Sequence, residues 1–218
     1  MSGKWSDRLN VFVNVLVVVF IFFLLLRPDG LLGSEVRRWR QSSSTRREIQ
    51  KGWAELAGSG QRVSVAAGPG RTLIEFADYQ CPACRQTHAV LPELTRQTGA
   101  TLLYRHFPLT TIHPSAEGAA RAAICAEEQG RFPQMHEHLY TTESWFTNPK
   151  WEDEARAVGV PDIPRFTRCL TSDATRRRLA QDRALADRLG IHATPTFVAR
   201  GGTVAGLPTA AALQRIVR

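Results

Sequence analysis

The sequence predicts an α/β domain in which two groups of strands are separated by a block of helices. Short apolar runs that follow glycine or turn residues indicate the strands. These runs cover residues 71–76, 101–107, 196–199 and 203–205. Between the two groups, residues 114–190 contain successive helical patterns, several ending at a glycine. An apolar segment near the N-terminus precedes the whole domain.

The apolar segment runs from Leu9 to Leu26, with Asn14 as the only polar side chain between Val11 and Leu26. Its 18 residues would span about 27 Å as a helix, close to the thickness of a bilayer core. A buried core helix is disfavoured because the segment is apolar on every side. A cleaved signal peptide is the better alternative, but the residues that follow offer no small-residue cleavage site. We therefore expect residues 9–26 to form a transmembrane anchor that follows a cytoplasmic N-terminus, residues 1–8.

The charges around this segment and the expected chemistry of the domain give opposite indications of its orientation in the membrane. Basic residues flank both ends: Lys4 and Arg8 before it, and Arg27, Arg37, Arg38 and Arg40 after it. The distribution of positive charge alone would place the rest of the chain in the cytoplasm. Dithiol chemistry, argued below, favours an oxidising compartment. We expect a single-pass protein of the cell membrane whose catalytic domain lies on the periplasmic or extracytoplasmic side.

Residues 27–60 are rich in glycine and serine and are expected to form a tether that is partly helical from Glu35 to Ala57, with Trp39, Trp53 and Leu56 as candidate surface contacts. Residues 61–218 have the usual size of one domain. The chain carries a net charge of +8. About half of this charge lies in residues 1–60, so the domain is only mildly basic. It contains no stripe of Lys and Arg interleaved with aromatic residues, which argues against a nucleic-acid partner.

The strand at 71–76 leads directly into Cys81-Pro82-Ala83-Cys84, which is expected to open a helix that runs towards Thr98. Cys81 then lies at the N-cap, and proline suits the next position because its missing N–H would be unpaired there. The spacing places both sulfurs on one side of the helix. The positive end of the helix favours a thiolate at Cys81, which lowers its pKa and makes it a good leaving group.

Other readings of the cysteine pair are weaker. A structural zinc site usually needs two more ligands with comparable spacing, and the sequence has no second C-x-x-C. A purely structural disulfide is uncommon at a helix start. A copper site that recruits His88, one turn after Cys84, remains open. We expect a redox pair, with no metal and no cofactor.

The element order is β–α–β, a helical block, then β–β–α, which is a thioredoxin fold with a helical insertion over about residues 114–190. Within residues 61–218 the sequence resembles the DsbA-like branch of the thioredoxin superfamily. The segments that carry the resemblance are IEFADYQCPAC, RHFPL, HPSAEGAARAA, QGRFPQMHEHLY and LGIHATPTFVARGG.

This resemblance implies two further parts of a catalytic site. Thr194-Pro195 would be a cis peptide facing the cysteine pair, where the backbone of Thr194 could pair with an extended substrate. Glu75 would be a buried acid that exchanges a proton with Cys84. Alternation along the strand also places Glu75 on the same face as Leu73. An exposed acid at the strand edge is the alternative.

The chain also departs from the family. The family's strong oxidants have histidine between the proline and the second cysteine, where this chain has Ala83. The missing positive charge near Cys81 puts strong oxidising power in doubt. The remaining cysteines, Cys125 and Cys169, both fall in the helical block, and we expect them to form a structural disulfide if the domain is exported. Two free buried thiols are the alternative.

Together these features predict a protein thiol–disulfide oxidoreductase that exchanges the Cys81–Cys84 disulfide with thiols of exported proteins, as an oxidant. The resemblance implies a quinone-linked membrane partner that restores the disulfide. A reductase or isomerase of the same fold is the closest alternative. A copper-binding module and a catalytically silent interaction domain are the others.

Overall fold

The computed structural model describes residues 15–17, 43–58, 60–64 and 71–217. The expected cytoplasmic N-terminus lies outside these residues, as does the expected anchor apart from residues 15–17, which are helical. Within the described part of the chain, no helix has both the length and the apolar character needed to cross a bilayer. Arg46 to Arg218 form one compact unit, which is described below.

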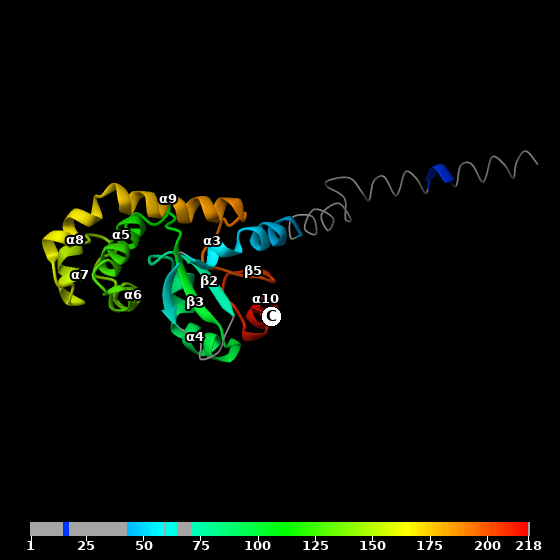
Figure 1. Cartoon of the computed structure of the whole chain (residues 1–218), viewed down its shortest axis with the longest axis horizontal. Helices are drawn as coiled ribbons and strands as arrows, with labels where there is room; N and C mark the ends of the chain where they lie inside the picture. Colours follow the sequence, from blue (N-terminus) through cyan, green and yellow to red (C-terminus); the bar gives the residue numbers. More distant parts are fainter. Residues whose placement is uncertain (1–14, 18–42, 59, 65–70, 218) are drawn as a thin grey trace, which may run out of the picture. The chain divides into compact units, whose positions relative to one another are not determined.

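The unit is built on a five-stranded sheet with strand order β1-β3-β2-β4-β5 (Figure 1). The strands are β1 (Gln61–Ser64), β2 (Thr72–Ala77), β3 (Thr101–His106), β4 (Thr196–Ala199) and β5 (Gly202–Ala205). Strands β2 and β3 are parallel, as their connection through a helix requires, and the other pairs are antiparallel. This sheet with the helices described next is a thioredoxin fold with a helical insertion, as predicted.

Two helices cover each face of the sheet (Figure 1). Helices α4 (Pro82–Thr98) and α10 (Ala210–Val217) pack on one face against Leu73, Leu102 and Phe197. Helices α3 (Trp53–Gly58) and α9 (Asp173–Arg188) pack on the other face. Strand alternation explains this division, because Leu73 and Ile74 of β2 point to opposite faces. Both residues are fully buried.

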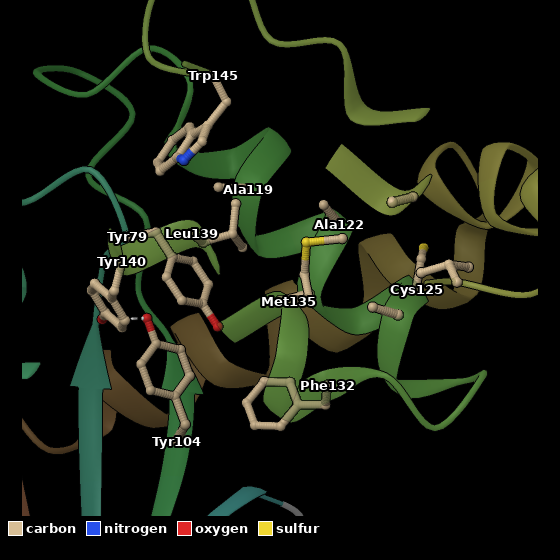
Figure 2. Close-up of a cluster of buried hydrophobic side chains, with 14 of the residues drawn as sticks. Tyr79, Tyr104, Ala119, Ala122, Cys125, Phe132, Met135, Leu139, Tyr140 and Trp145 are labelled. Atoms are coloured by element: carbon tan, nitrogen blue, oxygen red, sulfur yellow. Dashed lines mark hydrogen bonds between the residues drawn. The ribbon is translucent and has the colours of Figure 1, made fainter. Parts of the chain in front are cut away.

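The predicted insertion consists of helices between β3 and β4. They are α5 (Ala116–Glu127), α6 (Phe132–Thr141), α7 (Trp151–Ala157), α8 (Ile163–Leu170) and α9. The alanine-rich α5 lies at the centre of the insertion, because its small side chains let α6, α8 and α9 approach closely. The buried cluster between these helices reaches β3 at Tyr104 and the turn after β2 at Tyr79 (Figure 2).

The predicted tether, residues 27–60, extends too far. Residues 46–58 belong to the compact unit, and Ile49 and Leu56 are buried against α9 and the sheet. Arg105 holds this helix in place, since its Nη2 donates to the carbonyl oxygens of Glu55 and Leu56 at 2.9 and 2.7 Å. On its other side, Arg105 Nη1 donates to Asp182 of α9 at 2.7 Å.

Strand β1 was not predicted either. It is four residues long and pairs antiparallel with the outer edge of β3, with an irregular register between Arg62 and Ser64. Its sequence, QRVS, has only one apolar residue. The pairing therefore rests on the backbone of β3 and not on an apolar pattern that the sequence could reveal.

Candidate active site

The two cysteines of the motif lie at the junction between β2 and α4. Cys81 is the N-cap residue, with extended backbone angles, and Pro82 occupies the first turn. The Cys81 N–H donates to the carbonyl oxygen of Asp78 at 3.1 Å, which fixes the turn before the helix. Both cysteines are free thiols here, so the structure represents the reduced form. Cys81 is 7% exposed and Cys84 is completely buried.

The loop before β4 closes the site from the other side. Thr194-Pro195 is a cis peptide bond. The Cys81 thiol donates to the Thr194 carbonyl oxygen at 3.5 Å, so the structure brings Cys81, Thr194 and Pro195 together. The buried Thr194 hydroxyl has no hydrogen-bond partner among the described residues other than this sulfur. The Thr194 hydroxyl is therefore available to donate a hydrogen bond to a thiolate at Cys81.

Four contacts lower the pKa of Cys81 to about 5. The largest contribution is the hydrogen bond from the Cys84 thiol, and smaller ones come from Thr194 and from the backbone N–H groups of Cys84 and Ala83. Partial burial opposes them. These N–H groups belong to the first turn of α4 and have no partner within the helix, which is why a helix start stabilises an anion. At neutral pH the reduced protein therefore carries a thiolate at Cys81.

Cys84 has the opposite environment. Burial raises its pKa most, followed by the hydrogen bond to Cys81 and the charge of Glu75. Cys84 thus remains protonated until a nearby base takes its proton. The two sulfurs are therefore suited to different roles. Cys81 is an anion with a small exposed area that can react with other proteins, and Cys84 is a fully buried thiol that can close the disulfide.

Glu75 lies in the middle of β2, 2% exposed, on the sheet face covered by α4. Burial raises the pKa of its carboxyl group to about 8. A group with this pKa gives and takes protons readily near neutral pH. Its negative charge raises the pKa of Cys84. The exposed strand-edge alternative for Glu75 is therefore excluded by its burial.

Arg85 does not supply the positive charge that Ala83 lacks. Its Nη1 donates to the carbonyl oxygens of Leu139 and Thr142, at 3.0 and 3.2 Å, and its guanidinium lies over the ring of Phe146. Arg85 therefore joins α4 to the end of α6, and it is not among the main causes that lower the pKa of Cys81.

His88 is also directed towards α6. Its Nε2 lies 2.9 Å from Glu137 Oε2, and its ring stacks on Tyr140. Among the described residues no group of three or more His, Cys, Asp or Glu side chains is arranged to hold a metal ion. The copper interpretation would therefore require His88 to leave these contacts.

The second cysteine pair lies apart from the first, inside the insertion. Cys125 of α5 and Cys169 of α8 form a disulfide, with their Cα atoms 5.7 Å apart. Both are buried, and the Thr175 hydroxyl lies 3.4 Å from Cys169 Sγ. Both residues occur near the C-terminal ends of their own helices, and Thr175, in the first turn of α9, lies against both sulfurs, with its hydroxyl 3.8 Å from Cys125 Sγ.

Two further features lie near the site: Asp78, for which the sequence favoured a structural role, and a tyrosine pair that was not predicted. Asp78 accepts hydrogen bonds from the Leu109 N–H and from His113, at 2.9 and 2.7 Å, and so ties the active-site turn to the loop after β3. Tyr104 and Tyr140 lie buried beside Glu75 and Cys84. The sequence contained only a weak signal that the tyrosines would lie near the site. Tyr104 shares a strand face with Leu102, but Tyr140 belongs to a helix far along the chain.

Fold and site together define a thiol–disulfide oxidoreductase of the thioredoxin type. The sequence family described as Thioredoxin matches residues 69–218. The chain belongs to this family. A crystal structure of a thioredoxin-like oxidoreductase from Silicibacter pomeroyi is 30% identical in sequence, with a TM-score of 0.65, and the match covers 75% of this chain and 94% of that one.

More distant structures share the fold. The thiol-disulfide exchange protein alpha-DsbA2 from Wolbachia pipientis is 16% identical, with a TM-score of 0.69 over 82% of this chain and 96% of that one. A linker-deletion variant of Proteus mirabilis ScsC is 18% identical, also with a TM-score of 0.69, over 100% and 95% of the two chains.

Among curated proteins, this chain is similar to parts of larger ones. It is 36% identical over 131 residues to Na(+)/H(+) antiporter NhaA 3 of Salinispora tropica, which covers 60% of this chain and 20% of that protein. It is 36% identical over 151 residues to Na(+)/H(+) antiporter NhaA 1 of Mycolicibacterium gilvum, covering 66% and 24%. The chain thus spans about a fifth to a quarter of the length of these relatives.

Proposed function

We propose that this protein is a membrane-anchored oxidant that transfers the Cys81–Cys84 disulfide to thiols of exported proteins. The observation that carries the proposal is the contrast between the two sulfurs, with the pKa of Cys81 lowered to about 5 and that of Cys84 raised by burial. A stable thiolate favours the reduced form of the pair, and a protein whose reduced form is favoured passes its disulfide to others.

The proposed reaction has two exchanges. A substrate thiolate attacks Sγ of Cys81, the Cys81–Cys84 bond breaks, and Cys84 leaves as a thiolate that takes a proton from Glu75. A second substrate thiolate then attacks the substrate sulfur of the mixed disulfide, and Cys81 leaves as a thiolate. The substrate gains a disulfide and the protein retains two reduced cysteines.

The cis bond at Pro195 supports the substrate side of this proposal. The Thr194 carbonyl faces Cys81 at 3.5 Å, so an extended peptide whose cysteine reaches Cys81 passes along the backbone of Thr194. Reoxidation requires an acceptor of two electrons. We propose a quinone-linked membrane partner for this step, on the basis of the resemblance to DsbA-like proteins, and residues 9–26 as the anchor that keeps the two close.

The reduction potential tests the direction. The full-length chain, purified in detergent, is equilibrated with glutathione buffers, and the reduced fraction is measured by alkylation of Cys81. We expect a potential well above about −230 mV, on the oxidising side of glutaredoxins. A value near that of thioredoxin, about −270 mV, would instead identify a reductase.

Glu75→Gln tests the proton step. The amide has nearly the same size as the carboxyl group and cannot exchange a proton, so the steps that protonate or deprotonate Cys84 should slow by roughly tenfold or more near neutral pH. Rapid-mixing measurements of oxidation of a model dithiol peptide provide the readout. The pH dependence of Cys81 alkylation serves as the control, because Glu75 is not among the main causes that lower the pKa of Cys81.

A further inference from the structure

A buried carboxylate holds the active-site turn in place. Asp78 precedes Cys81 by three residues, and its side chain is completely buried. One carboxylate oxygen accepts the Gln80 N–H at 2.8 Å, and the other accepts the Leu109 N–H at 2.9 Å and bonds His113 Nδ1 at 2.7 Å. The carbonyl oxygen of Asp78 accepts the Cys81 N–H at 3.1 Å. Asp78 therefore holds the turn together internally and also joins it to the loop after β3.

His113 contributes to these contacts from the loop between β3 and α5. A carboxylate accepts hydrogen bonds and donates none, so Nδ1 of His113 donates to Asp78. The ring is largely buried, with 14% of the side chain exposed. The loop is itself a hydrogen-bonded turn, because the His113 N–H donates to the Leu109 carbonyl oxygen at 2.9 Å. Both donors to the second carboxylate oxygen therefore come from one folded turn.

A second link joins the same two segments. Gln80 Oε1 accepts the Ser115 N–H at 2.9 Å, and Ser115 Oγ donates to the Phe146 carbonyl oxygen at 2.7 Å. These groups are neutral, and hydrogen bonds to a carboxylate are stronger than bonds between neutral groups. The Asp78 bonds are therefore the main link, and the Gln80 bond keeps the loop attached when one of them is removed.

The two redox forms place different demands on the turn. In the disulfide form, the bond between the sulfurs itself joins Cys81 to Cys84. In the reduced form no such bond exists, and the backbone alone keeps Cys81 Sγ at 3.5 Å from the Thr194 carbonyl oxygen and close to the N–H groups that begin α4. Donors stabilise an anion best when its position is fixed in advance. Loosening the turn at Asp78 should therefore cost the reduced form more than the oxidised form.

We propose that Asp78 and His113 are positioning residues that hold the Cys81 sulfur against the start of α4 and thereby favour the reduced form of the cysteine pair. The proposal rests on the proposed function and deepens it, because it identifies side chains outside the cysteine motif that set how strongly the pair oxidises its substrates. Neither residue exchanges an electron or a proton with the substrate. The reaction remains the two thiol exchanges given above.

His113→Leu tests the proposal, and His113→Asn is the matched rescue. Leucine removes the donor to Asp78, whereas the asparagine amide nitrogen lies at about the place of Nδ1 and can still donate. In glutathione buffers, His113→Leu should shift the equilibrium roughly threefold towards the disulfide, a potential about 14 mV more reducing. The pKa of Cys81, read from its alkylation, should rise. His113→Asn should remain close to the wild type in both measurements, which use the full-length chain in detergent.

The potential separates positioning from simple structural support. A bond that stabilises both redox forms equally lowers the free energy of unfolding when it is lost, but cancels from the potential. His138→Leu is the control for this case. The His138 ring is 20% exposed and bonds the buried Glu154, so it forms a similar histidine–carboxylate contact between α6 and α7. This variant should lose stability and keep the potential of the wild type.

The outcomes separate this proposal from the proposed function. If the wild type exchanges no disulfides, the proposed function fails. If it does exchange them and His113→Leu keeps the wild-type potential, only the positioning role is overturned. An equal shift in His113→Asn or His138→Leu would overturn that role too. Urea unfolding checks that each variant is folded. Should His113→Leu not fold, Asp78→Asn, in which an amide nitrogen replaces one acceptor oxygen, should shift the potential in the same direction, and an unchanged potential there would overturn the role.

Discussion

The chain contains two cysteine pairs, and their surroundings differ in almost every respect. Cys81 and Cys84 begin a helix, where unpaired N–H groups face one sulfur and a cis-proline loop faces the same sulfur from outside. Cys125 and Cys169 lie near the ends of two helices, inside the insertion. The comparison shows that exposure does not separate the two pairs, since Cys81 and Cys169 are each 7% exposed. What distinguishes the exchangeable pair is the position of Cys81 at the start of α4, facing the Thr194 carbonyl.

The largest expected effect comes from Cys81→Ser. The serine hydroxyl is not ionised at neutral pH, so the nucleophile and leaving group are both lost, and exchange with a model dithiol peptide should fall by at least about 1,000-fold. Cys84→Ser should behave differently, because Cys81 remains a thiolate and should accumulate as a mixed disulfide with substrate. Mass spectrometry of the trapped species checks this. Equal loss in both variants without trapping would mean that the two sulfurs do not have the distinct roles assigned above.

The second prediction concerns the structural pair. Replacing Cys125 and Cys169 together by alanine should lower the free energy of unfolding by about 4 kcal/mol in the chain-entropy model, because their disulfide closes a long loop. Disulfide exchange at Cys81 should continue at temperatures where the variant is folded. Urea unfolding of the double variant and the wild type measures the difference. Loss of exchange in the folded variant would show that the two pairs are coupled.

Stability should depend on pH differently in the oxidised and reduced proteins. The folded-state pKa of Cys81, about 5, lies below the ordinary value of a cysteine, 9.0. Its thiolate therefore contributes stability that is fully present above the unfolded-state pKa and is lost as the pH falls through about 5. The stability advantage of the reduced form over the oxidised form should shrink between pH 9 and pH 5. Parallel urea titrations of both forms test this, and an advantage that grows on acidification would contradict the assignment.

The smallest effect is expected for Arg85→Gln. Arg85 is the cation nearest in sequence to the cysteine pair, yet its guanidinium bonds carbonyl groups of Leu139 and Thr142 and not the sulfur. The variant should lose roughly 1–2 kcal/mol of stability from these hydrogen bonds. The alkylation profile of Cys81 should not move. A clear rise in the pKa of Cys81 would show that Arg85 does stabilise the thiolate.

The sequence predicted most of this architecture because its strongest signals are local. The strand before Cys81, the helix after it and the succession of helices in the insertion all follow from apolar periodicity and capping residues. The short strand β1 was missed because it depends on the partner β3 and not on its own composition. The sequence offered Trp53 and Leu56 only as surface contacts of a partly helical tether. The docking of residues 46–58 depends on Arg105, whose bonds to Glu55 and Leu56 join segments about 50 residues apart.

The same distinction applies to the site. Cys81, Cys84 and Pro195 occur in short recognisable segments, so the sequence alone was enough to identify them as site residues. The cluster of three tyrosines near the site is built from β3, α6 and the active-site turn, and no single stretch of sequence displays it. The direction in which Arg85 points was equally hidden, since side-chain direction depends on acceptors contributed by another helix.

Arg105 has a mechanical consequence for whatever lies upstream of residue 46. Its backbone belongs to β3. One side of its guanidinium donates hydrogen bonds to carbonyl groups of α3, and the other side donates to Asp182 of α9. A pull on the N-terminal side of the domain is therefore transmitted into the sheet on the face opposite α4.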